Sequence, residues 1–90
     1  MGSYRIEWKR SALRELEKLP RQAVPRIVAA VENLSIHPRP QGVRKLVGCE
    51  QTYRIRMGDY RILYDIFEKR LIVEIIRVKH RKDAYKRGDP

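Results

Sequence analysis

The feature that most constrains the fold is residues 53–64, where apolar and basic side chains alternate on both sides of Gly58-Asp59. A period of two is typical of a β-strand with one buried face. A two-residue connection that begins with glycine favours a type II′ turn between two antiparallel strands. The pattern therefore predicts a hairpin with Arg54, Arg56 and Arg61 together on one face and apolar side chains on the other.

The rest of the sequence predicts a helical layer that would cover the apolar face of this hairpin. Leucines at helical spacing follow Ser11, an expected N-cap, until Pro20 ends the helix. A second apolar stripe, over residues 24–34, predicts another helix. The other expected elements are strands over residues 4–9, 53–57, 60–67 and 71–78, with a further short strand candidate at 43–47. We expect an α+β fold of order β-α-α-β-β-β, with an N-terminal strand and a helical hairpin packed on one face of an antiparallel sheet.

Length and residue usage exclude several classes of protein. A chain of 90 residues is the size of one domain, so residues 1–90 are expected to form a single domain, with residues 1–3 as an expression-tag remnant and 86–90 as a flexible tail. Because Cys49 is the one cysteine, an internal disulfide and a cysteine-rich zinc site are excluded. No other ligand spacing indicates a metal or a cofactor. Without a signal-peptide pattern or a long apolar run, we expect a cytoplasmic protein that does not bind membranes.

The charge balance indicates a polyanionic partner. Lys and Arg number 21 against 11 Asp and Glu, which gives a net charge of +10. A small domain with this charge repels itself unless a polyanion is bound, and nucleic acid is the leading candidate because its phosphates attract Lys and Arg. The alternative is a basic surface that is simply solvated. Charge alone does not separate RNA, DNA and an acidic protein.

Three arginines on one sheet face favour a phosphate site. In the predicted register Arg56 is directly opposite Arg61, and like charges in that position cost about 0.2–1 kcal/mol. An anion between the two guanidinium groups would remove this cost. Arg81 follows within a second basic cluster, residues 77–82. One arginine would extend into water, but the group as a whole predicts phosphate binding.

Two motifs resemble the RelE/ParE superfamily of bacterial and archaeal toxins. They are YRIRMGDYRILY at residues 53–64 and VKHRKDAY at residues 78–85, and the likeness covers nearly all of residues 4–86. The resemblance implies a microbial-ribonuclease-like α+β fold, in agreement with the order of elements predicted above. RelE-like members are mRNA interferases that cut mRNA in the ribosomal A site without a metal and leave a 2′,3′-cyclic phosphate. ParE-like members poison DNA gyrase and generally lack the catalytic basic set, so the basic set in this sequence favours the RelE-like branch.

The resemblance implies a catalytic role for five residues. Arg54 and Arg56 correspond to two active-site basic residues, and Arg61 corresponds to an arginine that activates the phosphate. Arg81 corresponds to an arginine near the leaving group, and Tyr85 to a tyrosine that stacks on the substrate or orients it. Guanidinium groups suit this reaction because they bind the non-bridging phosphate oxygens bidentately while attack by the 2′-OH builds negative charge there.

The identity of the general base stays open. Relatives often have lysine at the positions of Arg54 and Arg56. Because arginine keeps its proton in proteins, these two residues cannot act as an ordinary general base. Histidine titrates near neutral pH, so His80 could act as acid or base. Tyr85 would need neighbouring cations to lose its proton. We predict that Lys79, His80 and Lys82 contact RNA.

The resemblance also implies partners. These are a RelB-like antitoxin, the ribosome and mRNA, with operator DNA bound only by the toxin–antitoxin complex. A surface of charge +10 suits an acidic, partly disordered chain that folds as it binds. Such a chain would silence the site by covering the arginines or by displacing the tail that carries Arg81 and Tyr85. The alternative to an enzyme is a non-catalytic RNA-binding module, although the RNP aromatic motif and the GxxG loop are both absent.

Overall fold

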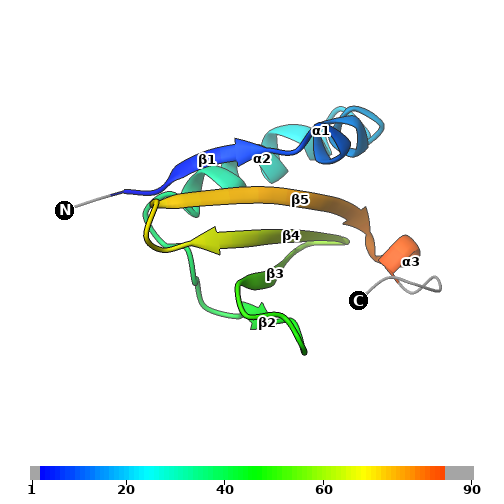
Figure 1. Ribbon diagram of the computed structural model, residues 1–90. Coiled ribbons are helices and arrows are strands. Elements are labelled where there is room, and N and C mark those ends of the chain that lie inside the picture. Colours follow the sequence, from blue (N-terminus) through cyan, green and yellow to red (C-terminus); the bar gives the residue numbers. More distant parts are fainter. Residues whose placement is uncertain (1–2, 85–90) are drawn as a thin grey trace.

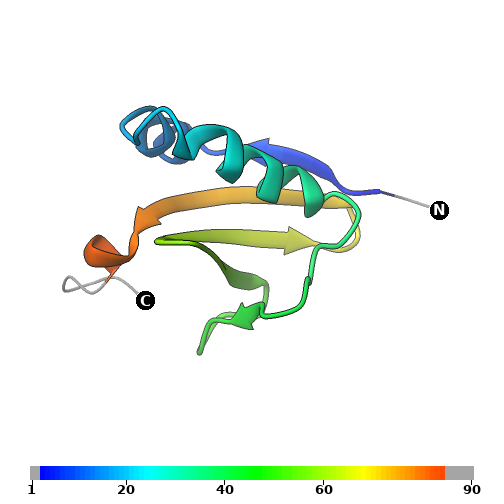
Figure 2. The ribbon, with the colours of Figure 1, turned by 180° about the vertical axis from the view of Figure 1, so that it is seen from behind.

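The computed structural model describes residues 3–84 and has two helices packed against one face of a five-stranded sheet (Figures 1 and 2). The elements in chain order are β1 (Arg5–Trp8), α1 (Arg10–Glu17), α2 (Ala23–Asn33), β2 (Arg44–Lys45), β3 (Thr52–Met57), β4 (Tyr60–Phe67), β5 (Ile72–His80) and α3 (Arg81–Ala84). The α+β class and the layer of two helices are as predicted. Within residues 3–84 no helix is long and apolar enough to span a membrane.

The sheet is mixed, with strand order β1-β5-β4-β3-β2. The pairs β2–β3, β3–β4 and β4–β5 are antiparallel, as expected. Strand β1 differs, because it pairs in parallel with β5 and places Arg5 opposite Ile72 and Trp8 opposite Ile75. The chain leaves β1 through two helices instead of a hairpin turn, and a helical connection permits parallel pairing.

The β3–β4 turn has the predicted register. Met57 pairs with Tyr60 across Gly58-Asp59, and Arg56 is opposite Arg61. Gly58 has a φ of 60°, in the region that the first position of a type II′ turn requires and that glycine enters without strain. The two faces of the hairpin therefore carry the side chains that the alternation predicts.

Strand β5 begins and ends later than predicted. It starts at Ile72 because Leu71 lies in the preceding turn with a φ of 55°, a left-handed conformation. It ends at His80, two residues beyond the expected end at Val78. The basic residues after Val78 therefore begin on the sheet and not in a tail.

Helix α1 begins at Arg10, so Ser11 lies inside the helix and is not its N-cap. The N-cap position belongs to Lys9, whose backbone N–H still donates to the carbonyl of Ile75 at 2.9 Å. Because the sheet bonding of β1 continues to Lys9, the helix follows the strand without a loop.

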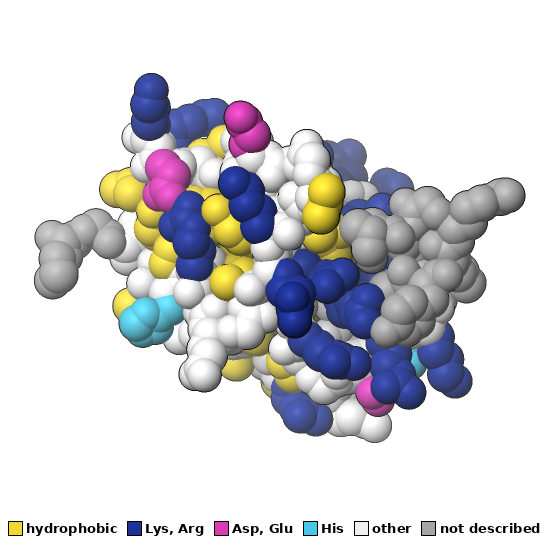
Figure 3. All heavy atoms as spheres, turned by 90° about the horizontal axis from the view of Figure 1, so that it is seen from below, with side chains coloured by type: hydrophobic (Ala, Val, Ile, Leu, Met, Phe, Trp, Pro, Cys, Tyr) yellow, Lys and Arg dark blue, Asp and Glu magenta, His cyan; other side chains and the backbone are white. Residues whose placement is uncertain are grey.

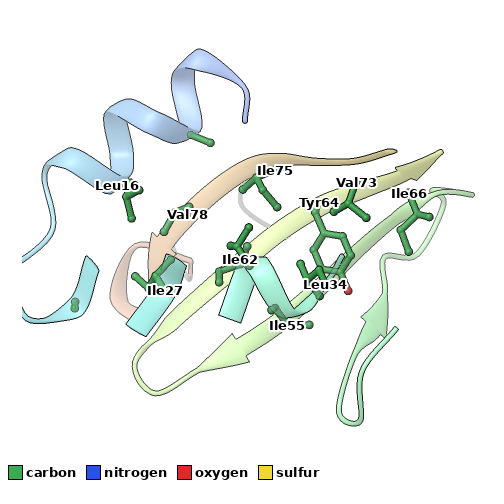
Figure 4. Close-up of a cluster of buried hydrophobic side chains, with 13 residues drawn as sticks. Leu16, Ile27, Leu34, Ile55, Ile62, Tyr64, Ile66, Val73, Ile75 and Val78 are labelled. Carbon is green, nitrogen blue, oxygen red and sulfur yellow. The ribbon is translucent and has the colours of Figure 1, made fainter. Parts of the chain in front are cut away.

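The core lies between the two helices, α1 and α2, and the sheet (Figure 4). Helix α2 contributes Ile27 and Val31, and its C-cap residue Leu34 continues the same buried stripe. Strand β4 contributes Ile62 and Tyr64, alternate residues that are equally buried. Each buried side chain of this size stabilises the fold by about 1.5–3 kcal/mol. This packing fixes the apolar face of the β3–β4 hairpin and leaves the basic side chains to the opposite face and to the outer edge of β3.

Candidate nucleic-acid interface

The basic face of the sheet carries rows of cations that cross neighbouring strands. Arg56 of β3 is opposite Arg61 of β4, which is opposite Lys79 of β5. In the next row Arg44 of β2 is opposite Arg54 of β3. Figure 3 shows Lys and Arg side chains gathered on the side of the molecule seen from below. We call Arg44, Arg54, Arg56 and Arg61 the arginine face.

The arginine face lines a hollow of about 480 Å³. The other walls are formed by α2, through Ala30 and Asn33, and by the loop of residues 40–42. The hollow opens at the outer edge of β3, because β2 begins opposite Arg54 and does not reach the last residues of β3. Its volume lies in the range of small-ligand sites, and the guanidinium groups on its walls suit a phosphate.

Arg81 lies at the end of the sheet beside the β3–β4 turn. Its backbone N–H donates to the carbonyl of Asp59 at 2.6 Å, and this bond fixes the start of α3. Its guanidinium Nε lies 3.9 Å from Asp59 Oδ1, and about half of the side chain is exposed. Asp59 directly follows the glycine of the turn, so Arg81 is near the strand ends that carry Arg56 and Arg61. The structure thus brings this predicted residue to the same end of the sheet.

The three predicted RNA contacts lie in different places. Lys79 is opposite Arg61, with its ammonium group 3.7 Å from a carboxylate oxygen of Glu15. His80 is opposite Tyr60, on the other side of the sheet from Lys79. The two rings meet edge-on, with their centroids 5.3 Å apart. The Nδ1 atom of His80 accepts the backbone N–H of Lys82 at 3.1 Å, and Lys82 is exposed on α3. Tyr85 lies outside the described residues.

The arrangement supports binding and charge stabilisation more directly than proton transfer. Guanidinium forks can hold the non-bridging oxygens of a phosphodiester and stabilise charge that develops on them. Among the described residues that line the hollow, none has a side chain that titrates near neutral pH. No three His, Cys, Asp or Glu side chains within residues 3–84 lie close enough together to hold a metal ion.

Comparison with known proteins identifies the family. The profile of the family described as ParE toxin of type II toxin-antitoxin system, parDE, matches residues 6–85. The chain is a member of the RelE/ParE toxin superfamily. The toxin is 40% identical over 92 residues to Toxin RelG of Mycobacterium tuberculosis, a match that covers 93% of this chain and 98% of that protein.

Two solved structures are similar to the toxin in both fold and sequence. The crystal structure of the toxin–antitoxin complex RelBE2 from Mycobacterium tuberculosis matches with a TM-score of 0.78 and 31% identity, and covers 87% of this chain and 98% of that one. The archaeal RelE–RelB complex from Pyrococcus horikoshii OT3 matches with a TM-score of 0.78 and 30% identity, covering 88% and 96%. These similarities confirm the resemblance seen in the two motifs.

Sequence reasoning did not assign a role to Arg44. The residue reaches the arginine face because β2, which has two residues, pairs Arg44 with Arg54. The strand candidate at 43–47 contained it, but the register of so short a strand depends on a partner that is distant in the sequence. The alternation in β3 could have found Arg44 only once that register was known.

The loop that forms one wall of the hollow is fastened to the far end of the sheet. The hydroxyl of Tyr64 donates to the carbonyl of Pro38 at 2.7 Å. Arg39 Nε donates to the hydroxyl of Tyr53 at 3.2 Å, its guanidinium stacks on the same ring, and it pairs with Glu68. Because Pro38 and Arg39 directly precede the loop wall, these contacts hold that wall in place.

The pKa values of two of these side chains are shifted, by different causes. The hydroxyl of Tyr4 donates to Glu68 at 2.5 Å, and this bond, with the Arg39 guanidinium, holds the pKa of Glu68 below its usual range. Burial raises the pKa of Tyr64 above its usual range. Glu68 is therefore a carboxylate, and Tyr64 a hydrogen-bond donor, at neutral pH.

Proposed function

We propose that this type II toxin is a metal-independent endoribonuclease that cuts mRNA in the ribosomal A site. The observation that carries the proposal is the hollow lined by Arg44, Arg54, Arg56 and Arg61. A toxin that acted only through a protein surface would not need guanidinium groups from three strands around one hollow the size of a small ligand. The names of the similar toxins, RelG and RelE, support the RelE-like branch.

The reaction would be an attack of the ribose 2′-OH on the adjacent phosphorus. The bond from phosphorus to the 5′ oxygen breaks, and the products carry a 2′,3′-cyclic phosphate and a 5′-OH. In this scheme Arg54, Arg56 and Arg61 bind the phosphate and stabilise the negative charge that develops on its free oxygens. Arg81 acts near the leaving oxygen, and Tyr85 orients the substrate; both roles come from the family resemblance.

The proposed dependence on the ribosome fits an open, cationic site. Positioning and charge stabilisation can supply a large part of the rate enhancement when the substrate is held in a reactive geometry. The arginine face binds phosphate, but the edge of a sheet cannot by itself fix the sugar pucker of a flexible RNA. The ribosome would supply that geometry by presenting the codon in a defined conformation.

We also propose that a RelB-like antitoxin neutralises the toxin. Two similar solved structures are toxin–antitoxin complexes, and each of those toxins is at least 30% identical to this chain. The net charge of +10 favours an acidic partner that covers the arginine face. Co-expression with an antitoxin encoded next to the toxin gene should therefore abolish growth arrest.

The deciding experiment is cleavage of mRNA on purified ribosomes by wild type and by Arg61→Ala. Wild type should give discrete, in-frame cuts without added metal, and Arg61→Ala should reduce the rate by about 10²–10³. Arg21→Ala, an exposed arginine between α1 and α2, is the matched control and should cut at the wild-type rate. Growth arrest with intact mRNA and broken DNA would refute the nuclease and support ParE-like poisoning of gyrase, which the name of the matching family profile suggests.

A further inference from the structure

Glu15 takes the place of a strand at the edge of β5. The pairing of β1 with β5 ends at Trp8 and Ile75, while β5 continues to His80. Beyond that point the backbone N–H of Val78 donates to Glu15 Oε1 at 2.8 Å. The carboxylate on α1 therefore satisfies a main-chain donor that β1 does not reach.

The second oxygen of the same carboxylate holds two cations. Glu15 Oε2 lies 3.3 Å from Arg77 Nε and 3.7 Å from Lys79 Nζ. Ala12 and Leu16, which flank Glu15 on α1, are buried in the core, so the helix cannot move away without unpacking. About a quarter of the Glu15 side chain is exposed. This geometry makes Glu15 a fixed partner and not a transient surface contact.

The two cations belong to the same sheet rows as the arginine face. Lys79 is opposite Arg61, and Arg77 is opposite Leu63, which is in turn opposite Arg54. The rows of positive charge would thus continue from the hollow across β5 towards α1. A phosphate chain that followed this continuation would miss the hollow, because β5 does not contribute to its lining.

We propose that Glu15 determines where RNA binds, by holding Arg77 and Lys79 against α1 and by repelling phosphates from β5. RNA phosphates are then restricted to the arginine face on β2, β3 and β4. The inference rests on the proposed function of that face, and it assigns Lys79 to Glu15 and not to RNA. Glu15 is a positioning residue, because it acts on RNA through its two cationic partners and through its own charge.

The test is the salt dependence of binding to a 2′-O-methyl RNA oligonucleotide, which cannot be cut by 2′-OH attack. For single strands the slope of log K against log salt steepens by about 0.7 for each additional phosphate contact. Glu15→Gln keeps an acceptor for Val78 but removes the charge, so Arg77 and Lys79 have one carboxylate fewer. We expect the slope to steepen by about 0.7–1.4 and the affinity at low salt to rise. Glu17→Gln, an exposed residue of the same helix, changes the net charge equally and should keep the wild-type slope.

A second variant tests the inference without disturbing Glu15. Lys79→Gln should bind RNA with the wild-type slope, because in the wild type Lys79 contacts Glu15 and not phosphate. Equal slopes for Glu15→Gln and Glu17→Gln, or a loss of about 0.7 in Lys79→Gln, would overturn the inference. Arg56→Gln separates this failure from failure of the proposed function. If Arg56→Gln leaves the slope unchanged, RNA does not bind the arginine face and the proposed function fails. If Arg56→Gln reduces the slope but Glu15→Gln or Lys79→Gln gives the contrary result, only the role of Glu15 is refuted.

Discussion

Arg56→Gln should make the toxin more stable and less active. Arg56 is directly opposite Arg61, and like charges in that cross-strand position cost about 0.2–1 kcal/mol. For a domain of this size, 1 kcal/mol shifts the melting temperature by about 4–8 °C. The substitution should therefore raise the melting temperature by about 1–8 °C at low salt. On the proposed function, loss of the Arg56 guanidinium should also lower cleavage of ribosome-bound mRNA by about 10²–10³.

The assay for this prediction is thermal unfolding followed by circular dichroism at low salt and again at 1 M salt. At 1 M the Debye length is about 3 Å, so repulsion between the two guanidinium groups is screened and the gain should disappear. Arg21→Gln changes the net charge equally without removing a cross-strand pair, and controls for the general charge effect. A lower melting temperature for Arg56→Gln, or a gain that persists at 1 M salt or recurs in the control, would refute the reasoning.

Four other predictions concern stability. Tyr64→Phe removes a hydrogen bond to a loop carbonyl and should lower the free energy of unfolding in urea by about 1–3 kcal/mol. Ile27→Ala should lower the same quantity by about 2–5 kcal/mol, because the side chain is fully buried. Leu71 has a left-handed φ of 55°, which costs a non-glycine residue about 1–2 kcal/mol. Leu71→Gly removes this cost but adds about 0.5–1 kcal/mol of chain entropy, so the melting temperature of the variant should rise slightly. The pKa of Glu68 is lowered, mainly by the hydrogen bond from Tyr4. This shift stabilises the fold above the unfolded pKa of Glu68, and the stabilisation is lost as pH falls through the folded pKa. In Glu68→Gln the free energy of unfolding should therefore depend less on pH below about 4.3.

Each of these predictions has a contrary result. An unchanged urea midpoint for Tyr64→Phe would mean that the hydroxyl does not hold the loop. A loss below 1 kcal/mol for Ile27→Ala would place that side chain outside the packed core. A fall in melting temperature for Leu71→Gly would mean that the leucine contributes more by packing than it costs by strain. The same acid dependence in wild type and Glu68→Gln would assign acid unfolding to other carboxylates.

The elements that could be predicted are those with a local signal. The β3–β4 hairpin was encoded by alternation and by a glycine at the first turn position, so the shared face of Arg54, Arg56 and Arg61 followed without any knowledge of the rest of the sheet. The stripe of Ile27, Val31 and Leu34 likewise identified the buried side of α2. In both cases the residues that determine the structure are neighbours in the sequence.

The elements that could not be predicted depend on pairing between distant segments. The parallel pairing of β1 with β5 has no local signal, and Arg44 reaches the hollow only through its register with Arg54. Lys79 and His80 show a second limit of local signals. The two residues are adjacent in one basic cluster, but β5 continues through both, and neighbours on a strand point to opposite faces. The contact of Glu15 with the backbone N–H of Val78 could not be predicted either, because helical spacing does not reveal which backbone N–H lies beside a helix.

The pairing of the first strand with the last bears on how this toxin is made. Strand β1 pairs with β5, with Arg5 opposite Ile72, and within the described residues it pairs with no earlier strand. The sheet can close only after β5 has left the exit tunnel, because so distant a pairing must wait for its second partner. On our proposal the target of the toxin is a translating ribosome, and this connectivity delays the active fold until β5 has emerged. On the same proposal, the ribosome that produces the toxin meets an active fold only after β5 has emerged from it.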